Sequence, residues 1–382
     1  MFNEKTLLNR RNFLKNSTPA IASILVPELV NNTFSYEPAV SGLKTRGVVL
    51  SVEDLLTLDW PLLAHEADLT TIATHVTPSQ VSEYIKSDKG QQFLLDCKKY
   101  DIQVEHELHA MKDLLPRALF AKDPDMFRMN DKGVRVPDFN CCVHSTDGMD
   151  IITENAVKYS ETLHSTTGRY FYWIDDAAPM CRCSQCKELT DSEQALMIEN
   201  RIIKALRNKI TDASLAHLAY QHTMVPPKNI KPEKGVFLEF APIVREWDKP
   251  LSDSKAGTEG IAPGGVRKIT HGECMDVLAA NLEVFPKETA QVLEYWLDVS
   301  LQSHWTKPAV KLSWYPQVCK SDVKTYMRAG ITNITTFAVY VDREYKNTYN
   351  NLNFIQEYGN ILKNVMLSIY VICIFMLSVP KF

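Results

Sequence analysis

Glycine is scarce in this chain, and no glycine-rich turn follows the first apolar run. The sequence has 14 glycines among 382 residues. The segment after residues 47–52 lacks the closely spaced glycines that allow a backbone to approach a pyrophosphate. A doubly wound nucleotide-binding sheet is therefore disfavoured.

A long basic run is also missing. Lysine and arginine total 42 and aspartate and glutamate total 46, which gives a net charge of −4. This balance argues against nucleic-acid binding, or membrane binding through bulk charge. The remaining composition, 45% hydrophobic and 23% charged, is that of a globular protein, and the length suits one large barrel-type domain or two average ones.

No clean Ala-x-Ala cleavage site is visible near the N-terminus, although this segment otherwise looks like an export signal. Arg10 and Arg11 precede Phe-Leu-Lys and a mildly apolar stretch over about residues 17–30. This pattern is typical of the bacterial twin-arginine signal. We therefore expect residues 1–35 to direct export to the periplasm or beyond, by a route that carries folded proteins. The alternative is a disordered basic terminus.

No apolar run is long enough to be a secure membrane span. Residues 365–379 are continuously apolar, but a spanning helix needs about 20 such residues, with a lower limit of about 17. Residues 365–382 form either a weak membrane anchor, a buried terminal helix or a non-native tail. A C-terminal helix is expected over residues 346–364.

Short apolar runs that alternate with helical patterns dominate the rest of the chain. The runs are residues 47–52, 69–74, 102–109, 170–175, 215–220, 236–240, 291–297 and 334–341. The helical stretches between them include residues 81–100, 150–164, 193–209, 274–285 and 322–329. Eight strands with intervening helices predict an α/β fold, a single (β/α)8 TIM-type barrel over residues 44–345. The irregular stretches 123–144 and 249–270 are candidate active-site loops.

Carboxylates interleaved with aromatic residues mark the ends of the predicted strands, where a barrel of this type builds its site. The candidate catalytic carboxylates are Asp175, Asp176, Asp298, Glu239 and Glu107. The candidate substrate-binding residues are His109, Tyr220, His222, Arg245, Trp296, Trp314 and Tyr340. Aromatic faces that stack on sugar rings, together with two acids, are what glycoside chemistry needs.

Each of these residues also has a structural alternative. Asp175 and Asp176 could cap the next helix or pair with an arginine, and adjacent strand residues point opposite ways, so that only one is expected to face the site. Glu105 is expected to form a buried ion pair, for instance with Arg117, and His217 to lie in the core. Trp173 is expected to pack rather than bind ligand.

Three cysteines follow the acid pair within six residues. Cys181, Cys183 and Cys186 have Cys142 as a candidate fourth partner, with Cys141 as a substitute. Four thiolates suit structural zinc, whereas an exported protein would also permit disulfides. Both readings stay open. A catalytic metal is disfavoured because a closed thiolate site leaves no open position.

Several further motifs resemble a bacterial exported family that is known as a domain of unknown function with a glycoside-hydrolase-like barrel. They are EHELHAM (105–111), LLPRALF (114–120), DPDMFRMN (123–130), DFNCC (138–142), WIDD (173–176), LAHLAY (215–220), PPK (226–228), FLEFAPI (237–243), VLEYWLD (292–298), FAVY (337–340) and YG (358–359). The resemblance covers about residues 44–363. The family is distantly similar to α-glucuronidase and β-hexosaminidase barrels.

The resemblance implies a carbohydrate substrate and an enzyme, a glycosidase acting on uronic-acid or N-acetylhexosamine sugars without a catalytic cofactor. By likeness to the hexosaminidases, Asp175 would orient the substrate and Asp176 would be the general acid, an analogy at the level of fold. Ile174 and Ala177 stand where the family has glycine. The alternatives are a non-catalytic carbohydrate-binding protein on the same barrel, and a thiol or metal redox protein.

Overall fold

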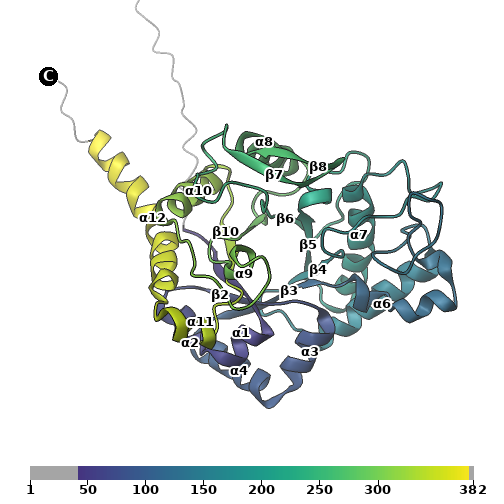
Figure 1. Ribbon diagram of the computed structural model, residues 1–382, viewed down its shortest axis with the longest axis horizontal. Helices are drawn as coiled ribbons and strands as arrows, with labels where there is room; N and C mark the ends of the chain where they lie inside the picture. The colour runs from purple at the N-terminus through teal and green to yellow at the C-terminus, as the bar shows by residue number, and fades with distance from the viewer. Residues whose placement is uncertain (1–41, 378–382) are drawn as a thin grey trace, which may run out of the picture. The chain divides into compact units, whose positions relative to one another are not determined.

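The structure, a computed structural model, describes residues 42–377 and the side chains of residues 42–365 (Figure 1). The export signal expected over residues 1–35 lies outside this range and stays a prediction.

Eight parallel strands close into a barrel in the order β1-β10-β9-β6-β5-β4-β3-β2. The strands are β1 (Thr45–Ser51), β2 (Thr71–His75), β3 (Gln103–His109), β4 (Arg169–Trp173), β5 (Ser214–Ala219), β6 (Val236–Phe240), β9 (Gln291–Glu294) and β10 (Asn333–Phe337). Each lies within one of the eight apolar runs or overlaps it. The predicted (β/α)8 barrel is confirmed, and the neighbour-to-neighbour order follows the short right-handed connections expected of βα units.

Helices surround the strands (Figure 1). They are α1 (Val52–Thr57), α2 (Trp60–Glu66), α3 (Pro78–Lys86), α4 (Asp88–Lys99), α5 (Met111–Leu114), α6 (Thr146–Thr162), α7 (Asp191–Lys209), α8 (His271–Leu282), α9 (Val299–Gln302), α10 (Pro316–Arg328), α11 (Arg343–Tyr349) and α12 (Asn353–Leu377). The apolar outer faces of the strands pack against these helices in one core. A second apolar cluster, which includes Phe171, Phe237 and Leu293, fills the barrel interior.

The single helix predicted over residues 81–100 is two helices. Ser87 ends α3, where its N–H donates to the carbonyl of Tyr84, and caps the start of α4, where its Oγ accepts from Gly90 N–H. A Cβ at position 90 would lie 2.0 Å from the carbonyl oxygen of Tyr84. Glycine at this position therefore permits the sharp corner between the two helices.

The predicted irregular loop 249–270 contains a β-hairpin. Strands β7 (Gly257–Ala262) and β8 (Gly265–Thr270) pair antiparallel and lie beside α8 at one edge of the barrel (Figure 1). Half of their residues are exposed, and the apolar alternation that reveals a strand is missing.

Helix α12 runs through the boundary expected at residue 364 and continues into the apolar segment. It packs against α10 and α2, and Gly359 allows it to approach α2, since a Cβ there would lie 1.7 Å from the carbonyl oxygen of Ala67. Within residues 42–377, no helix combines the length and apolar character that a membrane crossing requires.

Candidate active site

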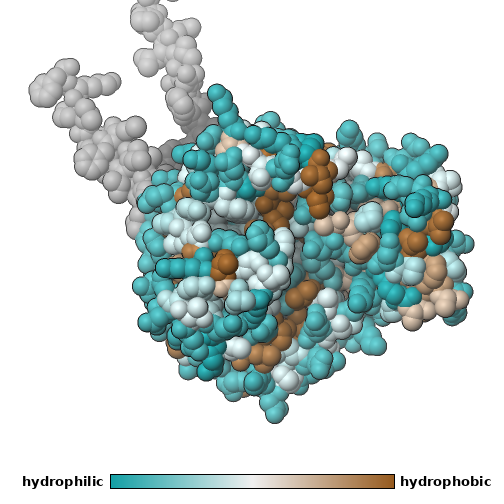
Figure 2. Space-filling view, viewed as in Figure 1, coloured by the Kyte–Doolittle hydropathy of each residue, from teal (hydrophilic) through white to brown (hydrophobic). Residues whose placement is uncertain are grey.

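A cleft of about 880 Å³ lies where the barrel strands end at their carboxyl side. Its lining comes from most of the strands and the loops that follow them, which is where barrel enzymes bind substrate. Figure 2 shows apolar residues gathered beside a hollow on this face. Of the predicted site residues, Asp176, Asp298, His109, Tyr220 and Tyr340 line the cleft.

The floor of the cleft is aromatic. Trp173, Tyr295 and Phe337 are almost fully buried and line it together with His75. The ring of Tyr295 lies 5.3 Å from that of Phe337, and His109 meets Trp173 edge-on at 5.1 Å. Trp173 was expected only to pack; it packs and also closes the bottom of the cleft.

Asp176 is the acid of the predicted pair that reaches the cleft. Its side chain is 58% exposed, and its Oδ1 lies 3.9 Å from His109 Nε2. The other ring nitrogen of His109, Nδ1, lies 2.8 Å from the carbonyl oxygen of Ile174. A carbonyl only accepts, so Nδ1 carries the proton and donates it, which turns Nε2 toward Asp176.

Asp298 enters the cleft as a helix cap and not as a strand residue. Strand β9 ends at Glu294, and Asp298 is the N-cap of α9, where its Oδ1 accepts from Ser300 Oγ at 2.6 Å and Leu301 N–H at 3.2 Å. Burial raises the pKa of Asp298 to about 6, although these hydrogen bonds favour the ionised form. The environment therefore holds a proton on Asp298 to a higher pH than on an ordinary aspartate.

Two tyrosines, Tyr220 and Tyr295, line the same cleft as these carboxylates. Burial raises the pKa of both Tyr220 and Tyr295, and the charges of Asp176 and Asp298 raise each of them further. The electrostatic influence of both acids therefore reaches each tyrosine. The two carboxylates face one shared space in the cleft.

His75 was not predicted as a site residue. Its Nδ1 lies 2.6 Å from the carbonyl oxygen of Glu107, so this nitrogen carries a proton that it donates. Burial, together with the neighbouring His109, lowers the pKa of His75 to about 3. The ring is neutral at physiological pH. The alternation of side chains along β2, which turns His75 toward the aromatic residues of other strands, was the sequence signal that could have revealed it.

Asp175 is held in the scaffold. Its Oδ2 accepts from Arg117 Nη2 at 2.6 Å and from the backbone N–H of Asn140 at 2.7 Å, and its own N–H donates to the side chain of Asn140 at 2.9 Å. Arg117, which was expected to pair with Glu105, thus pairs with Asp175. Glu105 lies near Arg169 instead, at 3.9 Å.

The turn that carries the acid pair has a strained residue. Ala177 adopts a positive φ of 49°, in the left-handed region that glycine tolerates best. Glycine, which the family resemblance implies at this position, would adopt this conformation without strain.

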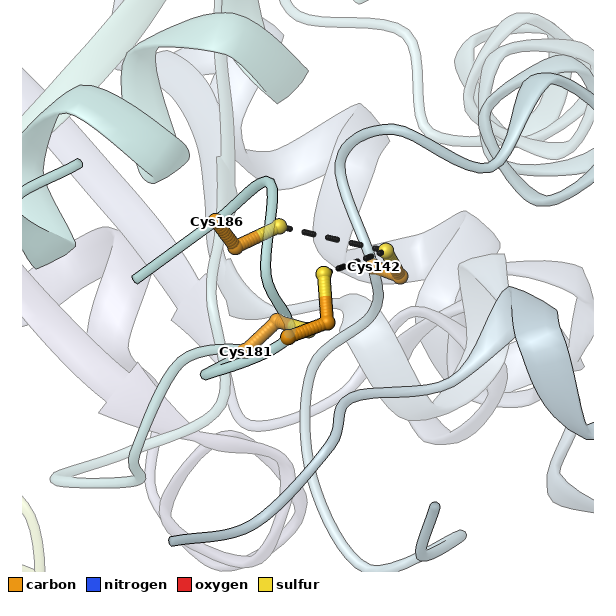
Figure 3. A group of neighbouring side chains, drawn as sticks. Cys142, Cys181 and Cys186 are labelled. Atoms are coloured by element: carbon orange, nitrogen blue, oxygen red, sulfur yellow. Dashed lines mark hydrogen bonds between the residues drawn. The ribbon is translucent and has the colours of Figure 1, made fainter. Parts of the chain in front are cut away.

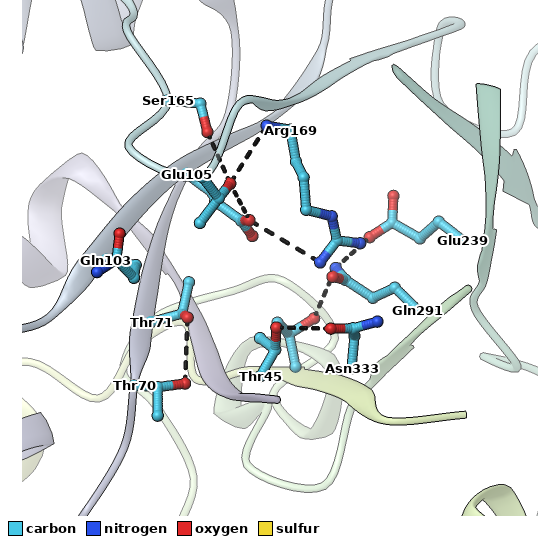
Figure 4. A network of polar contacts seen from close by, with 12 residues as sticks. Thr45, Thr70, Thr71, Gln103, Glu105, Ser165, Arg169, Glu239, Gln291 and Asn333 are labelled. Atoms are coloured by element: carbon cyan, nitrogen blue, oxygen red, sulfur yellow. Dashed lines mark hydrogen bonds and ion pairs between the residues drawn. The ribbon is translucent and has the colours of Figure 1, made fainter. Parts of the chain in front are cut away.

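Glu107 and Glu239 were predicted to be catalytic, and neither lines the cleft. Both are fully buried inside the barrel below it, where Gln291 Nε2 donates to Glu107 Oε1 at 3.1 Å and to Glu239 Oε1 at 2.8 Å. Trp173 Nε1 donates to the second oxygen of Glu239 at 2.8 Å. Figure 4 shows the guanidinium of Arg169 between Glu105 and Glu239.

The burial of these carboxylates changes their protonation. Burial raises the pKa of Glu239 to about 8. Burial, with the neighbouring Glu239 and Glu105, also raises the pKa of Glu107. We therefore assign Glu107 and Glu239 to the interior of the barrel, and no longer to direct contact with a substrate.

The predictions for Arg245 and Trp296 need the same correction. The guanidinium of Arg245 is fully buried and contacts Glu294 Oε1 at 3.0 Å and Asp322 Oδ2 at 2.7 Å. Trp296 is buried as well and its Nε1 lies 3.4 Å from the same Asp322 oxygen. This cluster fastens the loop after β6 to α10, on the outer side of the barrel.

Of the remaining predicted substrate-binding residues, one lines the cleft and two do not. Tyr340 lines the cleft, and its hydroxyl donates to the carbonyl of Trp305, an exposed cleft residue that was not predicted. Trp314 faces away and donates to Glu357 of α12 at 2.8 Å. His222 lies in a short 3-10 turn, Gln221–Thr223, and is not among the lining residues.

The four predicted cysteines come together. Cys142, Cys181, Cys183 and Cys186 are buried, and their Sγ atoms all lie within 4.8 Å of one another, as a metal site requires. Cys142 Sγ lies 3.8 Å from Cys183 Sγ and 3.9 Å from Cys186 Sγ (Figure 3). Cys141, the proposed substitute, is buried outside this group.

Glycoside hydrolases are among the solved structures to which this fold is similar. The β-galactosidase of the psychrophilic Marinomonas ef1 matches with a TM-score of 0.50 and 9% identity over 87% of this chain and 62% of its own. An exo-β-1,4-mannosidase from Opitutaceae bacterium strain TAV5 gives 0.41 and 11% over 85% and 61%. A GH20 module of a pneumococcal exo-β-D-N-acetylglucosaminidase gives 0.44 and 8%, with 85% of each chain covered.

These likenesses bear on the fold. This chain spans less than two thirds of the β-galactosidase and mannosidase chains. No curated protein matches the sequence. One family does match, over residues 26–262 of the 382, and it is described as "Domain of unknown function (DUF4838)". The chain belongs to this family.

Proposed function

We propose that this protein is a glycoside hydrolase that uses Asp176 and Asp298. The observation that carries the proposal is that both carboxylates line one cleft with an aromatic floor. Aromatic rings provide the apolar faces on which sugar rings stack, and two carboxyl groups provide the acid and the base or nucleophile.

The two environments suggest different roles. Asp298 is 4% exposed, and its pKa is raised to about 6 by burial, so it suits the general acid that protonates the leaving oxygen. Asp176 is 58% exposed and open to solvent, so it suits the base that activates water, or the nucleophile. This assignment reverses the role that the hexosaminidase likeness implies for Asp176.

The charge of the cleft bears on the choice of sugar. Its lining residues include four carboxyl groups, those of Glu53, Glu83, Asp176 and Asp298, and no Lys or Arg among the described residues that line it. The ammonium of Lys307 already pairs with the lining residue Glu53 at 2.8 Å and with Asp342 at 2.6 Å, so a uronic acid would add a negative charge without a free partner. Of the two sugar classes that the family resemblance implies, we therefore propose the uncharged N-acetylhexosamine.

The test is hydrolysis of aryl glycosides by the purified full chain and its variants. Asp298→Asn and Asp176→Asn should each lower kcat/KM for an aryl N-acetylhexosaminide by about 10²–10⁴-fold. Asparagine preserves the helix cap at position 298, so the loss reports the proton and not the cap. Wild-type kcat/KM should fall as the pH rises through about 6, because Asp298 then loses its proton.

Glu161→Gln, which alters an exposed ion pair with Lys209, is the control and should keep full activity. Hydrolysis that survives both aspartate substitutions would reject the acid assignment. A wild type that binds these sugars and hydrolyses none would instead support a carbohydrate-binding protein on the same barrel. Faster hydrolysis of glucuronides would overturn the proposed sugar class.

Two further parts of the proposal concern the rest of the chain. The twin-arginine-like segment supports export of the folded protein to the periplasm or beyond, and the apolar segment at the C-terminus leaves attachment to a membrane as the alternative to a free protein.

The chemistry at the cleft, an acid and a base or nucleophile supplied by two carboxyl groups, requires no metal. An ion held by the four cysteines would be structural zinc, because four thiolates leave no coordination position for a substrate.

A further inference from the structure

We propose that the four cysteines bind one zinc ion, and that this ion fixes the turn that carries Asp176. The zinc site stands independently of the proposed hydrolase activity, since it rests on residues outside the cleft. It joins the loop between β3 and α6, which supplies Cys142, to the loop between β4 and α7, which supplies Cys181, Cys183 and Cys186.

The spacing of the sulfur atoms favours a metal over a disulfide. A tetrahedral ion with Zn–S bonds of about 2.3 Å places its sulfur ligands about 3.8 Å apart. The Sγ of Cys142 lies 3.8 Å from that of Cys183 and 3.9 Å from that of Cys186, while a disulfide needs about 2.05 Å. All four sulfurs share one small volume, whereas disulfides would separate them into pairs. Binding exchanges thiol protons for metal bonds and requires no oxidant.

The surroundings of the sulfurs suit a negatively charged centre. Four thiolates and a zinc ion carry a net charge of −2. Cys181 Sγ accepts from the backbone N–H of Met129 at 3.3 Å and lies 3.5 Å from Arg135 Nη1, which brings a positive charge. Gln194 of α7 donates to the carbonyl of Cys181 at 3.1 Å and also contacts that of Cys186, at 3.4 Å. Groups beyond the ligands thus orient them, as is usual at metal sites.

The same two loops hold the acid turn. Asn140, two residues before Cys142, bonds to both the N–H and the carboxylate of Asp175. Its side-chain nitrogen also donates to the carbonyls of Ala178 and Pro179, at 3.3 Å and 3.1 Å. A metal that fixes Cys142 and Cys181 therefore closes a ring of contacts around residues 175–181, and Asp176 lies inside that ring.

The first experiment measures the metal. The purified full chain should contain about one zinc per molecule, and Cys183→Ser should reduce this content to a small fraction. Cys141→Ser is the matched control, because Cys141 is equally buried, adjacent to Cys142 and outside the cluster; it should keep its zinc. Titration of thiols in unfolded, unreduced wild type should find every cysteine reduced. Two or four missing thiols without zinc would overturn the site in favour of disulfides.

The second experiment tests the clamp on the wild-type protein, so that it does not depend on a variant that fails to fold. Removal of zinc by a chelator should speed amide hydrogen exchange in residues 123–145 and 175–190 by about tenfold or more, corresponding to a loss of about 1.4 kcal/mol. Exchange in the β7–β8 hairpin should not change, and added zinc should restore protection. Equal exchange with and without zinc, or a loss of protection over the whole chain, would overturn the clamp.

Discussion

The barrel contains two pairs of acids at different depths, and their surroundings differ in almost every respect. Glu107 and Glu239 lie inside the barrel, fully buried, where the amide of Gln291 contacts both. Asp176 and Asp298 lie above them in a cleft that solvent reaches. Glu107 and Glu239 belong to strands, whereas Asp176 lies in the turn after β4 and Asp298 caps a helix after β9, so proximity to a strand end does not by itself identify a catalytic acid.

Depth along the strand separates the two pairs. A side chain in the middle of an inward-facing row meets other side chains from the opposite wall, because the interior of an eight-stranded barrel is packed. A side chain beyond the last ladder residue can line the cleft instead, as those of Asp176 and Asp298 do. The inner pair is therefore packed among other side chains, and the outer pair is placed where a ligand can reach it.

Glu239→Gln would sharpen this comparison most. Glu239 accepts hydrogen bonds at both oxygens, from Trp173 and Gln291. The raised pKa of about 8 keeps a proton on Glu239 near neutral pH, but each carboxyl oxygen can still accept a hydrogen bond, whereas the NH2 group of glutamine only donates. A donor would therefore face a donor, and the free energy of unfolding should fall by about 1–3 kcal/mol. Urea unfolding measures this loss. Activity per folded molecule should stay within a few-fold of wild type. A loss of activity as large as that of Asp298→Asn would show that the inner pair takes part in catalysis together with the outer pair.

The pH dependence of stability should differ between wild type and Asp298→Asn. Burial raises the pKa of Asp298 from 3.8 to about 6, so the folded protein holds this proton more tightly than the unfolded chain does. The stability that it contributes is fully present below about pH 4 and is lost as the pH rises through about 6. Asparagine does not titrate, so the variant should gain about 2–3 kcal/mol relative to wild type between pH 4 and pH 8. An unchanged difference across this range would show that Asp298 is not shielded from solvent as described.

Trp305→Ala should have the smallest effect. The side chain is 62% exposed at the edge of the cleft, and it contributes little to the core. If it stacks on a sugar, KM should rise by about 3–10-fold with kcat unchanged. Unfolding should shift by less than about 0.5 kcal/mol. A fall in kcat instead would mean that the edge of the cleft contributes to the chemical step.

Much of the barrel could be predicted from the sequence because its strands are buried on both faces. Such strands read as apolar runs whose order the chain preserves, and each of the eight runs corresponds to a strand. The hairpin of β7 and β8 escaped because half of its residues are exposed and they alternate in no clear pattern. The Pro263-Gly264-Gly265 turn between these strands was the signal that could have revealed it.

The site could be predicted less well, for two reasons that particular residues show. The apolar run 291–297 predicts that Asp298 lies at the end of a strand, yet the strand ends at Glu294 and Asp298 reaches the cleft as a helix cap. Arg245 looked free to bind substrate because its partners, Glu294 and Asp322, are 49 and 77 residues away in sequence. The cysteine group was within reach because three of its members are close in sequence and buried thiols gather for few other reasons.

The hydrogen bonds around Asp298 have a consequence for how a proton could leave it. Ser300 Oγ and Leu301 N–H already donate to Oδ1. A negative charge formed there would meet two dipoles that are in position beforehand, so no segment of the chain has to reorganise when the charge appears. Release and recovery of the proton would then cost little motion, and the barrel could stay rigid through a full turnover.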